Sequence, residues 1–268
     1  MKIFQNPKKS LGQNFLIDKN IIAKIVKAGN IDKDTVVLEI GAGYGNLTEE
    51  IISHNPKKIF VVEKDNKLAS FLLEKYKKYK NVKVINQDIL DIIKKENSEK
   101  NVTVFGNLPY NISTQILSNL ITLKKWPPWY TSLTLMFQKE VANRIIAREK
   151  TKDFGRLAVL ANWRLEVNKN FNISKNSFFP KPKIDSTLLS FKPKKNNKFN
   201  LQNPKNLEEV TRILFSNRRK MINKNYNVLF KNNQIVAEKL KINLKKRPEE
   251  LKLETFYKMA VFYEKLFG

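Results

Sequence analysis

Apolar residues recur with two different periods along this chain of 268 residues. In the first two thirds, short apolar runs rich in β-branched residues alternate with stretches of helical spacing. The short runs predict strands near 36–40, 59–62, 82–85, 102–105, 132–137, 162–169 and 187–191. A chain that alternates strands and helices favours a parallel sheet covered by helices, which is the α/β class.

The C-terminal part of the chain keeps helical spacing alone. Val210, Ile213 and Leu214 begin this pattern, and it ends with the apolar positions of 251–267. The segment before it, 192–206, is rich in Lys, Asn and Pro, a composition typical of linkers. We therefore predict three parts: a domain over 1–191 with a basic N-terminal arm, a linker over 192–206, and a basic helical domain over 207–268.

A glycine-rich turn follows the first buried strand pattern. Val36–Ile40 leads directly into Gly41-Ala42-Gly43-Tyr44-Gly45, and helical spacing begins at Leu47. Strand, glycine turn and helix form the first unit of a Rossmann-like nucleotide-binding fold. The spacing differs from the dinucleotide pattern, and no Lys-Ser or Lys-Thr pair follows the turn, which excludes a Walker-type phosphate loop and weakens a nicotinamide site.

Two carboxylates end the next two predicted strands. Glu63 comes twenty residues after Gly43, where a carboxylate accepts hydrogen bonds from the ribose hydroxyls of an adenosine-containing ligand. Asp88 ends the third strand and can accept from the adenine amine, while Ile89 packs against the ring. Carboxyl ends of parallel strands meet at one edge of the sheet, so we expect these residues to surround one ligand. Charged residues that merely end strands are the alternative.

A fourth strand pattern ends in Phe105-Gly106-Asn107-Leu108-Pro109-Tyr110. Pro109 holds Leu108 in an extended conformation, so the Leu108 carbonyl is not absorbed into the following helix. Asn107 adds a side-chain oxygen acceptor, and Tyr110 adds a flat aromatic face. Two acceptors beside an aromatic ring suit a planar base that carries an exocyclic amine. An ordinary turn with a buried tyrosine is the alternative that these residues alone leave open.

The charge of the chain is strongly basic. Lys and Arg number 51 against 25 Asp and Glu, which gives a net charge of +26. Such an excess favours contact with a nucleic-acid backbone, although a membrane surface or a solvated lysine coat is an alternative. The candidate contacts are Arg144 and Arg148 on a predicted helix, Lys181 and Lys183 in a proline-stiffened loop over 177–186, and Arg218, Arg219 and Lys220 on one predicted helix.

Composition also excludes several classes of site. The chain has no Cys and a single His, His54, so it cannot build a disulfide, a zinc–thiolate site or a histidine-based metal site. No apolar run approaches the ~20 residues that span a bilayer, and Met1–Gln13 lacks the apolar region of a secretory signal. We expect a cytoplasmic monomer with neither bound metal nor membrane contact.

Several motifs, in order along nearly the whole chain, resemble one family, the KsgA/RsmA-type small-subunit (16S) ribosomal RNA adenine dimethyltransferases. The matching stretches are Leu11–Leu16, Glu39–Gly43, Phe105–Ser113, Gln138–Ala142, Gly155–Leu157, Phe178–Ser186 and Asn217–Lys220. The resemblance implies a Rossmann-like S-adenosylmethionine-dependent methyltransferase domain with a small all-helical C-terminal domain.

The resemblance also implies the reaction and the site. Methyl groups pass from S-adenosyl-L-methionine to N6 of two adjacent adenosines in a hairpin near the 3′ end of 16S rRNA, in the immature small subunit. The implied cofactor-binding residues are Gln13, Asn14, Leu16, Gly41, Gly43, Glu63, Asp88, Ile89 and Asn107. The implied catalytic residues are Asn107, Leu108, Pro109, Tyr110 and Phe178. Two rings are adjacent in the loop, and Phe178 is preferred to Phe179 by its distance from Asp185-Ser186.

Three other functions share some of these features. Erm-type large-subunit rRNA methyltransferases share the fold, the cofactor and the Asn107–Tyr110 motif, but Gln138–Val141 and Gly155–Leu157 resemble the small-subunit enzymes more. An RNA-binding or transcription factor with a methyltransferase fold would not need the intact motif. A nicotinamide oxidoreductase would need a third glycine that the turn does not place correctly.

Overall fold

The computed structural model describes residues 12–93, 99, 101–196 and 198–268. The chain divides into two compact units. The first contains residues up to Asn119 together with Pro128–Ala142 and Val167–Pro193, and the second contains Leu120–Pro127, Asn143–Glu166 and Lys194–Gly268. The second unit thus includes 207–268, which we predicted as a helical domain, and also two segments that we assigned to the first domain.

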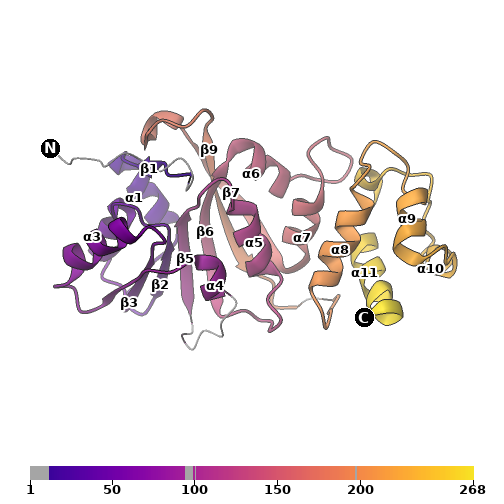
Figure 1. Ribbon diagram of the computed structural model, residues 1–268, viewed down its shortest axis with the longest axis horizontal. Coiled ribbons are helices and arrows are strands. Elements are labelled where there is room, and N and C mark those ends of the chain that lie inside the picture. Colours follow the sequence, from indigo (N-terminus) through magenta and orange to yellow (C-terminus); the bar gives the residue numbers. More distant parts are fainter. Residues whose placement is uncertain (1–11, 94–98, 100, 197) are drawn as a thin grey trace. The chain divides into compact units, whose positions relative to one another are not determined.

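A mixed sheet organises the first unit (Figure 1). Seven of the described strands form it in the order β4-β3-β2-β5-β6-β9-β7. Neighbours from β4 to β6 are parallel, and β9 is antiparallel to β6. The strands are β2 (Val36–Ile40), β3 (Lys58–Val62), β4 (Val82–Ile85), β5 (Val102–Asn107), β6 (Tyr130–Gln138), β7 (Leu165–Ile173) and β9 (Ser186–Pro193). The predicted α/β class is confirmed.

Three helices pack their apolar faces against this sheet. Helix α1 starts after Asp18, whose side chain accepts from two main-chain N–H groups of its first turn and so satisfies them. Apolar residues of all three helices join Val37, Ile59 and Val61 of the sheet in one core cluster. The helices are α1 (Lys19–Ala28), α2 (Asn46–Ser53) and α3 (Asn66–Tyr76), and α4 (Ile89–Ile93), α5 (Ser113–Ile121) and α6 (Lys139–Ile145) follow along the chain.

A two-stranded sheet connects distant parts of the first unit. Strand β1 (Phe15–Leu16) pairs antiparallel with β8 (Phe178–Phe179), which follows the short helix η2 (Lys175–Ser177). Phe15 lies opposite Phe179, and Leu16 lies opposite Phe178. The N-terminal motif and the aromatic loop motif therefore lie side by side, although Asp18 and its hydrogen-bond partner Ser177 are 159 positions apart in the sequence.

Helices with an aromatic core build the second unit. Phe154 is fully buried, and its ring contacts those of Phe215 and Phe256, which stack on each other at 5.4 Å. The helices are α7 (Arg156–Arg164), α8 (Lys205–Leu214), α9 (Asn223–Phe230), α10 (Ile235–Lys239), η3 (Pro248–Glu250) and α11 (Leu253–Phe267). Within the described part of the chain, no helix is long and apolar enough to cross a membrane.

Some predicted elements differ from the structure. The strand expected at 162–169 is wrong at its start, because α7 continues to Arg164 and the alternating pattern begins only at Leu165. The helix expected to carry Arg148 ends at Ile145. Arg218, Arg219 and Lys220 do not lie on a helix: α8 ends at Leu214, and polar Ser216-Asn217 favours the turns that follow. The predicted linker 192–206 overlaps the end of β9 and the start of α8.

Candidate cofactor and substrate pocket

A cavity opens at the carboxyl ends of β2, β3, β4 and β5, where open α/β sheets bind ligands. The strand ends adjoin, since the Gly41 N–H donates to Val62 O and the Glu63 N–H donates to Ile85 O. The space inside, including the part open to solvent, is about 1190 Å³. The predicted residues that line it are Gln13, Asn14, Leu16, Gly41, Gly43, Glu63, Asp88, Ile89, Asn107, Leu108, Pro109 and Tyr110.

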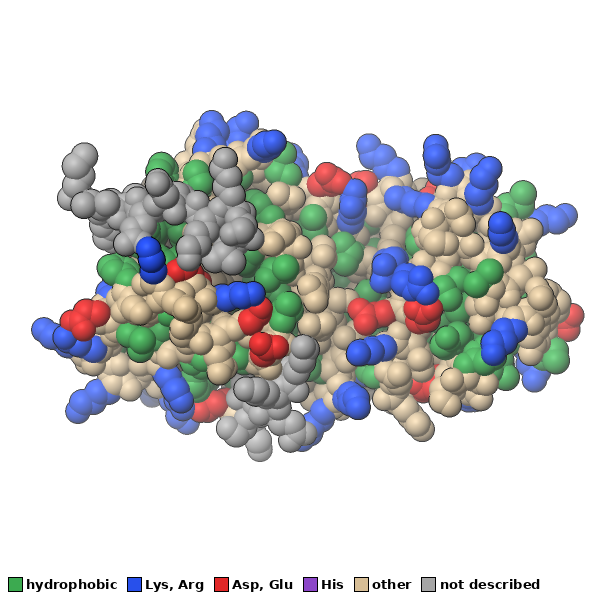
Figure 2. Space-filling model, in the orientation of Figure 1, with side chains coloured by type: hydrophobic (Ala, Val, Ile, Leu, Met, Phe, Trp, Pro, Cys, Tyr) green, Lys and Arg blue, Asp and Glu red, His purple; other side chains and the backbone are tan. Residues whose placement is uncertain are grey.

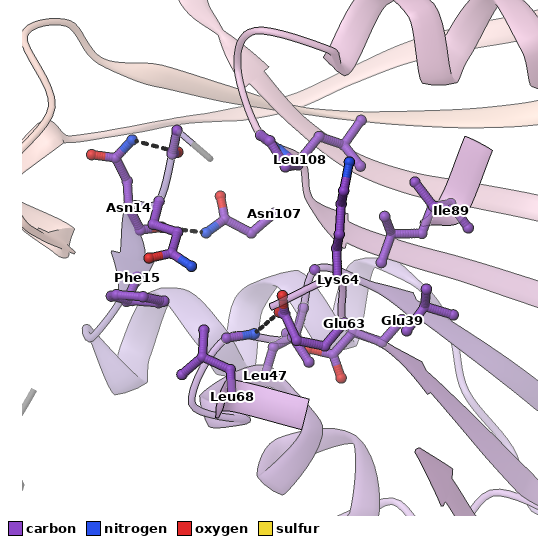
Figure 3. A pocket seen from close by; sticks show the side chains of 18 of the residues that line it. Asn14, Phe15, Glu39, Leu47, Glu63, Lys64, Leu68, Ile89, Asn107 and Leu108 are labelled. Atoms are coloured by element: carbon purple, nitrogen blue, oxygen red, sulfur yellow. Dashed lines mark hydrogen bonds between the residues drawn. The ribbon is translucent and has the colours of Figure 1, made fainter. Parts of the chain in front are cut away.

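Glu63 is fixed by two main-chain donors. The Gly43 N–H donates to Oε2 at 2.9 Å (Figure 3), and the Asp65 N–H donates to Oε1 at 2.9 Å. Burial raises the pKa of Glu63, while these donors favour its charged form. A carboxylate has about four lone-pair sites. Both oxygens of Glu63 can therefore still accept from a pair of neighbouring hydroxyls.

The glycine turn brings its backbone to the cavity in a conformation that other residues resist. Gly43 has φ +59°, and a Cβ atom there would lie 2.7 Å from Cδ1 of Phe15. The Phe15 ring also makes an edge contact with Tyr44, with centroids 4.7 Å apart. The absence of a side chain at Gly43 thus allows the N-terminal segment to close against the turn.

Asp88 already has two donors in the structure. The Leu90 N–H donates to Oδ1 at 2.9 Å, and Lys64 Nζ donates to Oδ2 at 2.8 Å. Lys64 extends across the cavity between Glu63 and Leu108 (Figure 3). The nearby Asp88 carboxylate raises the pKa of Lys64. A ligand amine that donates to Asp88 Oδ2 would meet this lysine, which sequence reasoning had not considered although it directly follows Glu63.

Glu39, the first residue of the matching motif Glu39–Gly43, is a second lining residue to which the sequence analysis gave no role in the site. Its side chain is 1% exposed, and the Thr48 hydroxyl donates to Oε2 at 2.6 Å. Burial, with a smaller contribution from the negative charge of Glu63, raises the pKa of Glu39 to about 7. Glu39 is the one charged residue of the apolar run Val36–Ile40, and this exception to the pattern was the available signal.

The N-terminal segment closes one side of the cavity. Asn46 Nδ2 donates to Leu16 O at 2.7 Å, and Asn107 Nδ2 donates to Asn14 O at 2.7 Å (Figure 3). These bonds and the β1–β8 pairing place Gln13, Asn14 and Leu16 beside the strand ends. Leu11, the first residue of the predicted motif, lies outside the described residues.

The aromatic residues predicted to hold a base differ in their surroundings. Tyr110 lines the cavity, its hydroxyl is 2.7 Å from the Ser186 hydroxyl, and burial raises its pKa. Phe178 is only 3% exposed, belongs to the main core cluster and does not line the cavity. Phe179, beside it, is 43% exposed. The structure thus brings Tyr110 to the cavity and leaves Phe178 in the core, opposite Leu16 of β1.

Comparison with known proteins identifies the family. The model of the family "Ribosomal RNA adenine dimethylase" matches residues 4–265. The chain belongs to this family. It is 50% identical over 266 residues to "Ribosomal RNA small subunit methyltransferase A" of Pelagibacter ubique (strain HTCC1062), covering 99% of this chain and 100% of that protein. It is 40% identical to the protein of that name from Wolbachia sp. subsp. Drosophila simulans (strain wRi), covering 99% and 97%.

Solved structures agree with this membership in the adenine dimethylase family. A dimethyladenosine transferase from Plasmodium falciparum superposes with a TM-score of 0.76 at 29% identity, covering 94% of this chain and 98% of that chain. The 23S rRNA methyltransferase ErmE gives a TM-score of 0.65 at 22% identity, covering 94% and 99%, which shows a shared fold. The predicted Rossmann-like methyltransferase fold and the predicted family are confirmed, and the chain is an rRNA adenine methyltransferase.

The basic residues predicted to contact RNA lie in both units of this dimethylase. Lys181 and Lys183 are exposed in the first unit, before β9. In the second unit Arg144, Arg148, Arg219 and Lys220 are exposed, whereas Arg218 is half-buried. Figure 2 shows Lys and Arg side chains spread widely over the visible face, with fewer Asp and Glu among them. Among the described residues, no group of three or more His, Asp or Glu could hold a metal ion.

Proposed function

We propose that this protein transfers methyl groups from S-adenosyl-L-methionine to N6 of two adjacent adenosines in a hairpin near the 3′ end of 16S rRNA. The products are dimethyladenosines, made during maturation of the small subunit. The observation that carries the proposal is that Asn107, Leu108 and Tyr110 line the same cavity as Gly43 and Glu63. The names of the relatives at 50% and 40% identity support the small subunit as the substrate.

The residues at the strand ends fit S-adenosylmethionine. Glu63 presents two fixed carboxylate oxygens to the ribose hydroxyls, and Asp88 offers an acceptor to the adenine amine. Ile89 supplies an apolar contact for the adenine ring. The remaining members of the set surround the same cavity: Gln13, Asn14, Leu16, Gly41, Gly43 and Asn107.

The chemistry required of the protein is positioning of a poor nucleophile. The bound cofactor supplies an electrophilic methyl group on a sulfonium. Asn107 Oδ1 and the Leu108 carbonyl accept hydrogen bonds from the adenine amine, which favours a pyramidal nitrogen with a directed lone pair. A nitrogen–carbon bond forms as the sulfur–carbon bond breaks, and the nitrogen then loses a proton to water.

Aromatic rings hold the base while this happens. Tyr110 stacks on the flipped adenine, and its hydroxyl bond to Ser186 fixes the ring. A second ring comes from the loop after η2. Phe178 can serve only if β8 shifts, since it is buried in this structure, whereas Phe179 is already exposed. Both rings therefore stay candidates.

The protein works as a monomer in the cytoplasm on immature small subunits. Exposed Lys and Arg side chains of both units contact phosphates, because the net charge of +26 attracts the RNA backbone. The exposed members of the predicted set are Arg144, Arg148, Lys181, Lys183, Arg219 and Lys220, and the seventh predicted residue, Arg218, is half-buried.

One experiment tests the proposed substrate. The protein is incubated with methyl-labelled S-adenosylmethionine and immature small or large ribosomal subunits, and the modified nucleotides are mapped by mass spectrometry. We expect dimethyladenosine at two neighbouring positions of small-subunit RNA. Label confined to large-subunit RNA would instead indicate an Erm-type activity, and absence of label in both would contradict the proposed reaction.

A further inference from the structure

A basic loop joins α6 and α7 in the second unit. Arg148, Lys150 and Lys152 alternate with other residues there, and all three side chains are exposed. The loop returns to the core at Phe154, which is fully buried. Three exposed cations within five residues form a cluster of positive charge that suits the phosphates of an RNA backbone. We call residues 148–152 the basic loop.

Three separate contacts fix the basic loop to the C-terminal part of its own unit. The Lys150 N–H donates to the main-chain oxygen of Glu249 at 2.8 Å. The Leu253 N–H at the start of α11 donates to Glu149 Oε1 at 2.6 Å. The third contact is Arg218, whose Nε donates to Glu249 Oε2 at 2.8 Å and whose Nη2 donates to Thr151 O at 3.2 Å.

The loop conformation needs this support. Lys150 has φ +65°, a left-handed conformation that is uncommon for residues other than glycine. A residue in this strained conformation persists only where the surroundings hold it. Local bonds contribute, since the Thr151 hydroxyl donates to Arg148 O at 2.6 Å. Arg218 adds a link between Thr151 and Glu249 that local bonds do not supply.

We infer that Arg218 is a positioning residue, which presents the basic loop to the rRNA backbone instead of contacting a phosphate itself. Its side chain is half-buried, and its guanidinium is committed to a carboxylate and a main-chain carbonyl. Arg219 and Lys220, next to it, are exposed and contact phosphates directly. The RNA-binding surface of this unit therefore includes the basic loop, Arg219 and Lys220 in addition to Arg144. This inference rests on the proposed function.

An electrostatic role and a positioning role of Glu249 predict opposite effects of Glu249→Gln on RNA affinity. Glu249→Gln removes a negative charge near the RNA, so a purely electrostatic surface would bind RNA more tightly. If Glu249 and Arg218 hold the loop, the same variant binds RNA more weakly, because an amide is a poorer partner for a guanidinium than a carboxylate. Glu254→Gln in α11 is the matched control. It removes the same charge but breaks only an exposed pair with Lys258.

The experiment measures affinity of the full-length protein for small-subunit rRNA across a salt series. We expect Arg218→Lys and Glu249→Gln each to weaken binding by about three- to tenfold, and Glu254→Gln to leave it unchanged or slightly tighter. Lys keeps the charge of Arg218 but cannot bridge two acceptors with a planar fork. Arg219→Ala and Lys220→Ala should each reduce the salt slope by about 0.7–0.9.

Hydrogen exchange in the free protein supplies a readout that is independent of RNA. Arg218→Lys and Glu249→Gln should raise exchange across the basic loop, whereas Arg219→Ala should leave it unchanged. Unaltered S-adenosylmethionine affinity would show that the variants are folded. Normal affinity of Arg218→Lys with tighter binding by Glu249→Gln would overturn the inference. Failure of the unaltered protein to bind rRNA would instead contradict the proposed function, whatever the exchange data show for the loop.

Discussion

Asn107 donates its side-chain N–H to the main-chain oxygen of Asn14, with an N···O distance of 2.7 Å. One residue ends β5, and the other lies in the N-terminal segment, 93 positions away. Because Nδ2 of Asn107 is the donor here, Oδ1 is the acceptor end of the amide. The N-terminal segment therefore sets the orientation that the proposed catalytic role of Asn107 requires.

This arrangement predicts the behaviour of two Asn107 variants. Asn107→Ala should slow methyl transfer by on the order of 10²–10³, the usual loss for one preorganised hydrogen-bonding group. Asn107→Asp should do no better, because a carboxylate cannot donate to Asn14 O and would repel it. Single-turnover methyl incorporation at saturating cofactor and RNA measures the effect. RNA affinity should stay near normal, and a near-normal single-turnover rate would contradict the role.

The residues that end strands could be predicted from sequence because their signal is local. Glu63, Asp88 and Asn107 each lie at the end of a recognisable apolar run. Because the carboxyl ends of parallel strands lie at one edge of a sheet, these residues could be expected to lie close together. The contact between Asn14 and Asn107, and that between Tyr110 and Ser186, had no such signal. They depend on how β1, β8 and β9 pair over long sequence separations, which no local pattern records.

Helix ends and unit boundaries were harder to predict for the same reason. Arg218 lies in a turn because α8 ends at Leu214, where the ring of Phe215 packs against Phe256. Residues 143–166 join the second unit, where buried Phe154 contacts that same ring pair. The sequence pattern marks these aromatic residues as apolar but does not indicate which other residues they contact.

The ribose contact predicts the effect of changing Glu63. Glu63→Ala should weaken S-adenosylmethionine binding by roughly 1–3 kcal/mol, because hydroxyls that enter the site lose their acceptors. Glu63→Gln should bind S-adenosylmethionine with an affinity between those of the parent protein and Glu63→Ala, because its one amide oxygen can still accept a hydrogen bond. Calorimetry measures the affinity, and thermal unfolding without cofactor shows whether the glycine turn survives loss of its bond to Glu63. Unchanged affinity would remove Glu63 from the site, and tight NAD binding would favour an oxidoreductase.

Replacing Lys64 should strengthen cofactor binding, whereas replacing Glu63 should weaken it. In this structure Lys64 Nζ donates a hydrogen bond to Asp88 Oδ2, the acceptor proposed for the adenine amine. The Lys64 side chain is 58% exposed, so its ion pair with Asp88 is weak. Removal of the Lys64 charge should therefore tighten cofactor binding by roughly two- to fivefold. Lys64→Met keeps most of the length and removes the charge. Lys67→Met is the control, since Lys67 is a neighbouring lysine that does not line the cavity. Weaker binding by Lys64→Met alone would mean that Lys64 holds the cofactor.

Glu39 predicts how stability depends on pH. Burial raises its pKa in the folded protein from 4.5 to about 7, so between these values the folded state holds a proton that the unfolded state has lost. The free energy of unfolding therefore falls as pH rises through this window. The loss for this one group is roughly 3 kcal/mol by pH 8, at 1.36 kcal/mol for each pKa unit. Below pH 4.5 both states are protonated, and the contribution is fully present.

Glu39→Gln should remove most of this pH dependence. Glutamine cannot ionise, and its side-chain oxygen can still accept from the Thr48 hydroxyl, so the variant should match the parent near pH 4.5 and exceed its stability at pH 8. Part of the slope should remain, because burial raises the pKa of Glu63 too. Denaturant unfolding of the cofactor-free protein from pH 4.5 to 8 measures how the free energy of unfolding depends on pH. Glu74→Gln is the control, because the Glu74 side chain is 72% exposed. A variant that loses stability with pH as steeply as the parent would show that Glu39 is already ionised in the folded state at low pH.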